Sequence, residues 1–405
     1  MKTKDRAKKA KILQKYSDDL DFDPVHFLRC HSKKSDYADV QTQVWQCAFE
    51  PDTDNLGQTT SLIATCGGNS ICFINVESGE VISKYYAKDL REMFYTLAWT
   101  SVAQMTVLAT AGVRNTIHLI HPAANVVFLQ HLLKENRNKS HINFLLFHPI
   151  SKNILFCGSS NGEILVFDIG EPMPPSYQCD FKYLFQLSAN SEVFGLSFCS
   201  VSHVLLAACN NGLKGWNFQS VLEFNKDNVP ELMSFSLPTK DDREQDITNQ
   251  DLVDSVEVLG DGTVATKCAL HGAIYLWSLS DTLENNSLVV KPTHVLRWSN
   301  TDNYFMVLGA HRDAGLLCCG DDGGALWLYD ISKMPEGSIE KPCCVEPTIV
   351  ISWPNVTDQF SDKKRKLNLD VYDIVVDKVA VSSSGKYIVA VTNNNMVCIW
   401  KQSKY

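Results

Sequence analysis

Residues 314–332 read AGLLCCGDDGGALWLYDIS, and this stretch decides the fold. Two short apolar runs, at 316–319 and 326–329, flank the turn-forming residues Asp-Asp-Gly-Gly. Runs rich in branched and aromatic residues on both sides of such a turn predict a β-hairpin. The glycines lie between two strands and do not open a helix, so they predict a turn and not a phosphate-binding loop.

The same pattern occurs seven times along the chain. The other six copies begin at residues 59, 105, 152, 203, 262 and 385. Their spacing is roughly 45–60 residues, longer where insertions occur, and endings such as VFDIG, YLWSL and VCIWK are similar to WD-repeat blades. The sequence therefore predicts an all-β fold, a seven-bladed WD40-type β-propeller.

A propeller must close its ring or leave an exposed sheet edge. The last copy ends near Trp400 without a fourth strand, whereas the strand-like stretch 24–30 (PVHFLRC) has no hairpin partner. We predict that this N-terminal strand completes the seventh blade. The predicted organisation is a short basic tail with some helical pattern (1–23) and a propeller (24–405). Surface-loop insertions are predicted at about 222–250, with a strand near 231–237, and at 354–370.

The composition excludes several classes of protein. A hydrophobic content of 45% with 20% charged residues is ordinary for a globular protein. The net charge of −9 argues against a protein that coats DNA. No run approaches the roughly 18 apolar residues of a membrane helix, so no membrane association is expected. The fourteen cysteines form no C-x-x-C pair, so we expect free thiols in a reducing intracellular compartment and no metal site.

Enzyme motifs are missing from the sequence. The histidines are dispersed, and H-E-x-x-H, G-x-S-x-G and P-loop patterns do not occur. Asp168 and Asp330 stand at strand ends, where WD repeats use a carboxylate to fix a turn. No catalytic residue and no cofactor are expected, and a propeller enzyme is the least favoured function class.

Aromatic residues recur at one position of the predicted inner strands. Five of these strands end in Phe49, Trp99, Phe147, Phe198 and Leu308. Four residues earlier stand Trp45, Tyr95, Asn143, Phe194 and Tyr304, which blade symmetry places around one rim of the channel. The aromatic members either pack between blades or form a cage for a quaternary ammonium group such as trimethyl-lysine.

Longer stretches resemble two known families. Residues 92–101 (EMFYTLAWTS) and 141–170 resemble the embryonic ectoderm development protein family, the WD-repeat subunits of Polycomb repressive complex 2. The likeness is closer to the WD-repeat domain of the leucine-rich repeat and WD repeat-containing protein 1 family, which is associated with the origin recognition complex. It is carried by PVHFLRCHS (24–32), TQVWQCAFEP (42–51) and ATCGG with a following Cys (64–72). That family has leucine-rich repeats that find no counterpart in these 405 residues, so functions that depend on them are not expected.

The resemblance implies a function as well as a fold. Both families are similar in binding trimethylated histone lysines, so methylated histone H3 or H4 tails are the implied ligands. The Polycomb cage falls on Trp45, Tyr95 and Tyr304 or Phe305 of this sequence, and the strand register adds Phe194. The first hypothesis is a chromatin reader that recruits or stabilises the origin recognition complex at heterochromatin. The alternative is a Polycomb-like scaffold subunit of a histone methyltransferase complex.

Two basic stretches favour a nuclear protein. The first fifteen residues hold seven Lys or Arg, and Lys363, Lys364, Arg365 and Lys366 form a compact cluster. Such clusters serve nuclear import or contact phosphates, although solvated tails have the same composition. With the chromatin resemblance, we expect nuclear import from 363–366 and an auxiliary nucleic-acid contact from the tail.

Overall fold

The computed structural model describes residues 20–32, 36, 39–124, 126–133, 140–175, 177–219, 224–238, 252–284, 287–301, 303–353 and 374–403. Residues 1–19 of the predicted basic tail lie outside the described residues, as does the whole insertion at 354–370 with its basic cluster at 363–366.

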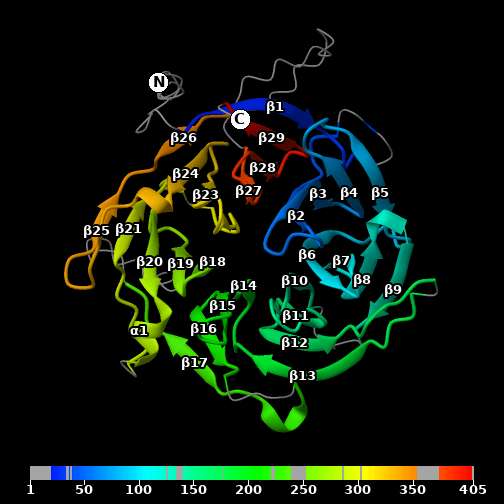
Figure 1. The fold of residues 1–405 in the computed structure, drawn as a ribbon, viewed down its shortest axis with the longest axis horizontal. Helices are drawn as coiled ribbons and strands as arrows, with labels where there is room; N and C mark the ends of the chain where they lie inside the picture. Colours follow the sequence, from blue (N-terminus) through cyan, green and yellow to red (C-terminus); the bar gives the residue numbers. More distant parts are fainter. Residues whose placement is uncertain are drawn as a thin grey trace, which may run out of the picture.

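Seven sheets are arranged in a ring around a central channel (Figure 1), which confirms the propeller prediction. Blade 1 comprises β2 (Val44–Pro51), β3 (Thr59–Gly67), β4 (Ser70–Asn75) and β5 (Val81–Tyr86). Blade 2 comprises β6 (Phe94–Val102), β7 (Met105–Gly112), β8 (Thr116–His121) and β9 (Val126–Leu132). Blade 3 comprises β10 (Ile142–Phe147), β11 (Ile154–Ser159), β12 (Glu163–Asp168) and β13 (Lys182–Ser188).

Blades 4 to 7 include a short helix, a strand from an insertion and the N-terminal strand. Blade 4 comprises β14 (Val193–Cys199), β15 (Val204–Cys209), β16 (Gly212–Asn217) and β17 (Leu232–Phe235). Blade 5 comprises β18 (Val253–Leu259), β19 (Thr263–Cys268), β20 (Ala273–Ser278) and β21 (His294–Arg297), with the short helix α1 (Leu279–Glu284). Blade 6 comprises β22 (Gly309–His311), β23 (Leu316–Gly320), β24 (Leu326–Asp330) and β26 (Ile349–Ile351). Blade 7 comprises β27 (Val376–Val381), β28 (Tyr387–Thr392), β29 (Val397–Gln402) and β1 (Phe22–Leu28).

Strand β1 closes the ring, as the sequence predicts. It pairs antiparallel with β29, with Phe22 opposite Gln402 and Leu28 opposite Val397. The strand begins two residues before the predicted start, because Phe22 is itself buried in the core between blades 6 and 7. The first and last strands therefore form one sheet, and the seventh blade depends on both ends of the chain.

Two outer strands come from insertions. Strand β17 lies within the insertion at 222–250 and is the outer strand of blade 4, where the sequence predicts a strand near 231–237. Strand β25 (Cys343–Val345) was not predicted, and it pairs parallel with β21 as a fifth strand of blade 5. Three apolar residues alone give too short a pattern to distinguish such a strand from a loop.

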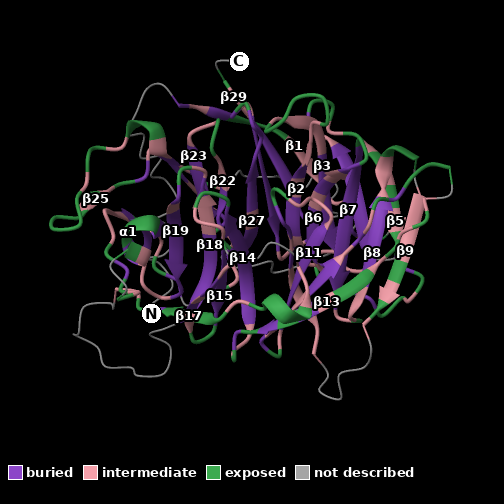
Figure 2. Cartoon of the chain, turned by 60° about the horizontal axis from the view of Figure 1, so that its bottom comes forward, coloured by how far each residue is buried: buried purple, intermediate pink, exposed green. Residues whose placement is uncertain are grey.

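Burial decreases from the inner and middle strands of a blade to its outer strand (Figure 2). Every residue of β7, β15 and β28 is buried, because neighbouring blades cover both faces of these strands. The outer strand β5 instead alternates between half-buried and exposed residues. This gradient explains why the continuous apolar runs of the sequence mark the middle strands.

All fourteen cysteines are free, and eleven of them are buried. The unpaired thiols agree with the sequence-based expectation, and burial of eleven of them is typical of small apolar residues. Among the described residues, no helix has the length and apolar character needed to cross a membrane.

Candidate functional site

The inner strands share an irregularity close to their first residue. In six blades the pairing register between the first two strands shifts around one residue, leaving Trp45, Tyr95, Asn143, Phe194, Asp254 and Asp377 at equivalent bulges. A bulged residue is left unpaired in the ladder, and the strand bends there. The sequence register predicts that Trp45, Tyr95, Asn143 and Phe194 lie on one rim, and these four residues occupy equivalent positions in their blades.

The register prediction is wrong for blade 6. The amide of Leu308 donates to the Ser255 hydroxyl at 3.0 Å, as the amide of Leu145 does to the Thr96 hydroxyl at 2.9 Å in blade 3. Leu308 therefore corresponds to Leu145, so Met306 and not Tyr304 corresponds to Asn143. Tyr304 lies two residues too early in the chain, because β22 begins only at Gly309 and the preceding residues are not a strand.

A cavity of about 210 Å³ opens between these inner-strand positions. It is lined by Trp45, Gln46, Tyr95, His141, Asn143, Phe144, Glu192, Phe194, Phe305 and Val307. Four of the five residues proposed for an aromatic cage thus line one cavity. Its volume is below the roughly 300–1,000 Å³ of pockets for drug-sized ligands, which suits a single side-chain head group.

The aromatic walls consist of two groups of rings. Trp45 and Tyr95 pack edge to face, with ring centroids 5.2 Å apart. The Phe194 and Phe305 rings form a second edge-to-face pair at 4.9 Å. Tyr304 is not among the lining residues, but its ring lies 4.6 Å from that of Phe305 and remains 45% exposed.

Phe305 reaches the cavity through an unusual backbone conformation. Its φ of 71° lies in the left-handed region, which bulky side chains rarely adopt. The fully buried Asp254 lies beside it, ion-paired with the equally buried Lys267. Burial raises the pKa of Asp254, while Lys267 and a hydrogen bond from the Phe305 backbone amide oppose this rise. The buried Asp254–Lys267 ion pair therefore lies next to Phe305, whose ring forms this part of the cavity wall.

The polar part of the wall carries one acid and no base that is charged at neutral pH. The Asn143 amide donates to the Glu192 carboxylate at 3.0 Å, which fixes that side chain. His141 packs edge to face on Tyr95 at 5.5 Å, and burial lowers its pKa, so it is neutral at pH 7. Among the ten lining residues there is no Lys or Arg. The combination of aromatic faces and one carboxylate favours a cation.

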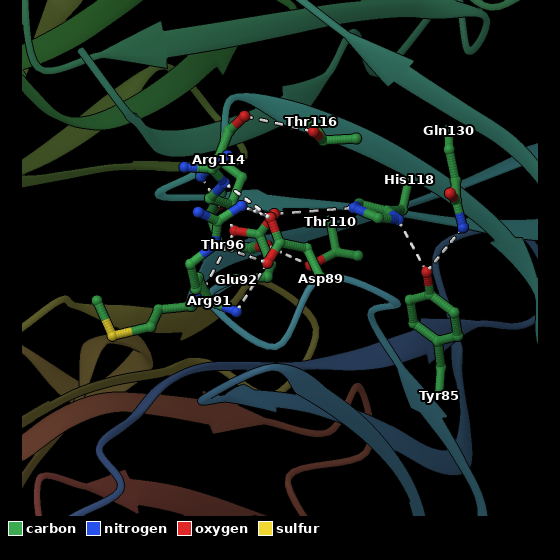
Figure 3. A network of polar contacts seen from close by, with 11 residues as sticks. Tyr85, Asp89, Arg91, Glu92, Thr96, Thr110, Arg114, Thr116, His118 and Gln130 are labelled. Carbon is green, nitrogen blue, oxygen red and sulfur yellow. Dashed lines mark hydrogen bonds and ion pairs between the residues drawn. The ribbon is translucent and has the colours of Figure 1, made fainter. Parts of the chain in front are cut away.

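A polar network around the buried Glu92 and His118 side chains links the loop before β6 to β8 (Figure 3). Glu92 accepts the backbone amides of Met93 and Arg114, both at 3.2 Å, and so joins the β5–β6 loop to the β7–β8 turn. His118 lies 4.0 Å from the Glu92 carboxylate and hydrogen-bonds the Tyr85 hydroxyl at 2.9 Å. Burial is the main reason that the pKa of Tyr95 is raised, and the negative charge of Glu92 adds to it.

Sequence reasoning did not find the polar wall residues. Gln46, His141 and Glu192 come from three different blades, and Asn143 was noted only as the non-aromatic member of the series. His141 and Glu192 each lie just before an inner strand, so they are equivalent positions in neighbouring blades. The repeat register could have found them if it had been extended by two residues.

A family model for the WD domain of leucine-rich repeat and WD repeat-containing protein 1 matches residues 16–403. The chain belongs to this family. The relative from Xenopus tropicalis is 31% identical over 415 aligned residues, which cover 96% of this chain and 56% of the relative. The human relative is 32% identical over 397 residues, which cover 93% and 57%. The chain thus spans little more than half the length of these relatives.

The fold is similar to that of solved propellers in Polycomb complexes. A chain in the crystal structure of the Chaetomium thermophilum Polycomb repressive complex 2 matches with a TM-score of 0.67 and 12% identity. The match covers 94% of this chain and 98% of the other. A chain in a humanised mutant of the same complex, bound to the inhibitor GSK126, gives a TM-score of 0.66 and 11% identity. Both likenesses show that this family domain shares the propeller fold.

Proposed function

We propose that this chain is a non-enzymatic chromatin reader that binds trimethylated lysine of a histone H3 or H4 tail. The observation that carries the proposal is the cavity of about 210 Å³, walled by Trp45, Tyr95, Phe194 and Phe305. Aromatic faces attract a quaternary ammonium through the ring quadrupole. Tyr304 at the rim extends the apolar surface toward the neighbouring part of the peptide.

Each wall contributes differently to recognition. The rings supply cation–π attraction, worth about 0.5–2 kcal/mol per well-placed contact depending on desolvation. Glu192 adds a fixed negative charge beside the rings, and neutral His141 adds no repulsion. An unmodified ammonium is smaller and more strongly hydrated, so it loses more on entering an aromatic cavity. These differences favour the methylated form.

The test is a titration of the protein with matched histone H3 and H4 peptides, unmodified and trimethylated. We expect at least tenfold tighter binding of one methylated peptide, which corresponds to about 1.4 kcal/mol. Tyr95→Ala and Trp45→Ala should abolish the preference, whereas Tyr95→Phe should retain most of it because the ring remains. The control is Tyr86→Ala, which removes an exposed tyrosine from β5 of blade 1.

Two outcomes would overturn the reader function. One is equal affinity for methylated and unmodified forms of every tail. The other is an unchanged preference in a folded Trp45→Ala, Tyr95→Ala double variant. In either case the rings would be interblade packing residues, since aromatic side chains also fill wide interfaces.

At the level of the cell, we propose a nuclear protein that recruits or stabilises the origin recognition complex at heterochromatin. The support is membership of this family and the basic cluster Lys363–Lys364–Arg365–Lys366 as an import signal. Replacing the four basic residues by alanine should move a fluorescent fusion from the nucleus to the cytoplasm. Unchanged nuclear accumulation would show that this cluster is not the import signal.

A second candidate is a scaffold in a histone methyltransferase complex, favoured by a larger groove. This groove of about 610 Å³ is lined largely by residues 331–337, which follow β24, and it includes Asp261 of the β18–β19 turn and Arg312 of the β22–β23 turn. Those turns lie at the opposite ends of the inner strands from the bulges, so the groove and the aromatic cavity belong to different faces. Affinity purification separates the candidates: origin recognition subunits support the reader, and a SET-domain enzyme supports the scaffold.

A further inference from the structure

A cluster of two cysteines and a histidine lies where the ring closes. Cys30 and His31 follow the closing strand β1, and Cys72 lies on β4 of blade 1. The two sulfur atoms and one imidazole nitrogen all lie within 4.8 Å of one another, and all three residues are buried. Among the described residues this is the group whose donor atoms converge in this way.

The segment is held from both sides of the closure. The His31 amide donates to the Asn395 side chain of blade 7 at 3.2 Å. The Cys72 thiol donates to the Cys30 carbonyl at 3.3 Å, and the Lys84 ammonium donates to the same carbonyl at 2.9 Å. The cluster is therefore positioned by backbone and side-chain contacts before any ligand enters.

The donor spacing fits a thiophilic metal ion. A tetrahedral zinc ion with Zn–S of about 2.3 Å and Zn–N of about 2.05 Å places sulfur and nitrogen ~3.6 Å apart. The Cys72 sulfur lies 3.8 Å from His31 Nδ1. Metal binding therefore needs only a small movement of side chains that are already adjacent.

The chemical types of the donor atoms suit a thiophilic metal ion. Two cysteine sulfurs and one imidazole nitrogen converge in this buried cluster. Thiolate sulfur is the ligand that zinc and copper(I) select.

We propose that Cys30, His31 and Cys72 form a binding site for a thiophilic metal ion, zinc(II) or copper(I), that fastens the closing segment to blade 1. The two sulfur atoms and Nδ1 supply three ligands. The Ser70 hydroxyl, 2.8 Å from Nδ1, or a water molecule is available for a fourth. On binding, the two S–H bonds are replaced by metal–sulfur bonds and both protons pass to solvent. Nδ1 binds through its lone pair, with the single ring proton on Nε2, where the Thr65 hydroxyl accepts it. No oxidation or reduction is involved.

The alternative is a purely structural cluster. His31 has a hydroxyl partner on each nitrogen, Ser70 at 2.8 Å and Thr65 at 2.8 Å. Those bonds also fix the ring, and second-shell hydroxyls of this kind orient histidine ligands in metal sites. The Ser70 hydroxyl already donates to the Gly67 carbonyl at 3.1 Å, so Ser70 keeps a hydrogen-bond partner when Nδ1 binds an ion.

The test uses the full chain, demetallated and kept reduced without oxygen. Cobalt(II) should bind with one equivalent and give the intense absorption of thiolate-to-cobalt charge transfer, and zinc should bleach it. Copper(I), delivered from a competing chelator, is the separate second arm. A bound ion stabilises the folded state by mass action, so the unfolding midpoint should rise by several degrees with the preferred ion.

Matched variants locate the site. Cys30→Ser and Cys72→Ser should abolish the cobalt spectrum and the thermal shift, whereas Cys209→Ser, at a buried cysteine of blade 4, should leave both unchanged. If either serine variant fails to fold, alkylation of the parent protein under mild denaturation tests whether metal protects the two cysteines. Two cysteine peptides, those containing Cys30 and Cys72, should be protected only when metal is present.

Three results would overturn the proposal. The folded, reduced protein could show no cobalt spectrum and no thermal shift with either ion. Binding could persist in both serine variants, which would place the ion at other thiols such as the adjacent Cys343 and Cys344. A Cys30–Cys72 disulfide in protein isolated under reducing conditions would make the cluster a redox pair and not a metal site.

Discussion

At the residue scale, the buried Glu92 and His118 form a pair whose charge depends on pH. Burial raises the pKa of Glu92 to about 7 and lowers the pKa of His118 to about 4. At neutral pH His118 is therefore uncharged, and Glu92 is divided between its two forms. Glu92 accepts the amide of Met93 in the loop just before β6, the strand that carries Tyr95, and the charge of Glu92 adds to the burial that raises the pKa of Tyr95.

The two pKa shifts have opposite effects on stability. The folded state holds the Glu92 proton more tightly than the unfolded state does, so this contribution is complete below about pH 4.5 and is lost as the pH rises through 7. The His118 contribution is complete above about pH 6.5 and is lost as the pH falls through 4. Between pH 4.5 and 6.5 the two slopes oppose each other.

Glu92→Gln should remove the pH dependence of stability that Glu92 contributes and leave the one that His118 contributes. The free energy of unfolding of the variant, measured by chemical denaturation from pH 4.5 to 8, should therefore rise relative to that of the parent as the pH increases. Contributions of all other groups cancel in this difference if the fold is unchanged. A difference that stays constant over the range would show that Glu92 is ionised normally in the folded state.

At the scale of elements, closure depends on a single strand, β1, whose first residue alone is buried. Phe22 on β1 is buried among residues of blades 6 and 7, and Phe27 packs edge to face on Trp400 at 6.1 Å. Val25 on the same strand is 37% exposed. The strand is thus anchored by its aromatic side chains as well as by its ladder with β29.

Phe22→Ala should lower the free energy of unfolding by about 3–5 kcal/mol, the usual cost of truncating a buried phenylalanine. Val25→Ala on the same strand should cost less than about 0.5 kcal/mol, as substitutions at exposed sites do. Urea denaturation of both variants checks this. Equal costs for the two would mean that β1 contributes through its backbone alone.

Gly112 at the end of β7 tests how tightly the loop before Tyr95 is packed. A Cβ atom at this position would lie 1.8 Å from the Met93 carbonyl oxygen, whereas one at Gly195 on β14 would lie 3.6 Å from its nearest neighbour, Ala208. Neither glycine has a positive φ. The two positions therefore differ in available space and not in backbone conformation.

Gly112→Ala should destabilise the protein by about 3 kcal/mol, the upper part of the range for overpacking, and weaken peptide binding because Tyr95 must shift. Gly195→Ala should change stability by less than about 1 kcal/mol. Thermal unfolding and peptide titration of the two variants measure both effects. A Gly112→Ala protein as stable as the parent would show that the loop can move aside freely.

At the scale of the whole molecule, the ring protects most thiols from solvent. Cys344 is exposed, Cys179 and Cys343 are half-buried, and the other eleven cysteines are buried. Because the blades cover one another, these buried thiols become accessible only when the ring opens or unfolds.

A thiol reagent such as Ellman's reagent should therefore react rapidly with Cys344 in the native protein and more slowly with Cys179 and Cys343. All fourteen thiols should react at once in denaturant. The reaction followed with and without urea measures this, with mass spectrometry to identify the labelled residues. Rapid native labelling of Cys398, which is buried in blade 7, would indicate that the closing blade opens readily.

The sequence by itself determined the fold and its closure. Hairpins with apolar strands and Gly- or Asn-rich turns depend on neighbouring residues, so seven copies and a lone strand at 24–30 specify seven blades and their joint. The same local register identified Trp45, Tyr95 and Phe194, because bulges recur at the same distance from each strand end.

Only the tertiary structure decided which residues meet. Counting four residues back from Leu308 gave the wrong position for Tyr304, because the residues before β22 do not form a strand. Phe305 adopts a positive φ there, beside the buried Asp254. Glu192 and His141 join the cavity, and Cys72 joins Cys30 and His31, through contacts between residues far apart in the chain. Repeat patterns in the sequence reflect the geometry within a single blade. The aromatic cavity and the Cys30–His31–Cys72 cluster both lie between blades, where loop paths and packing determine which side chains converge.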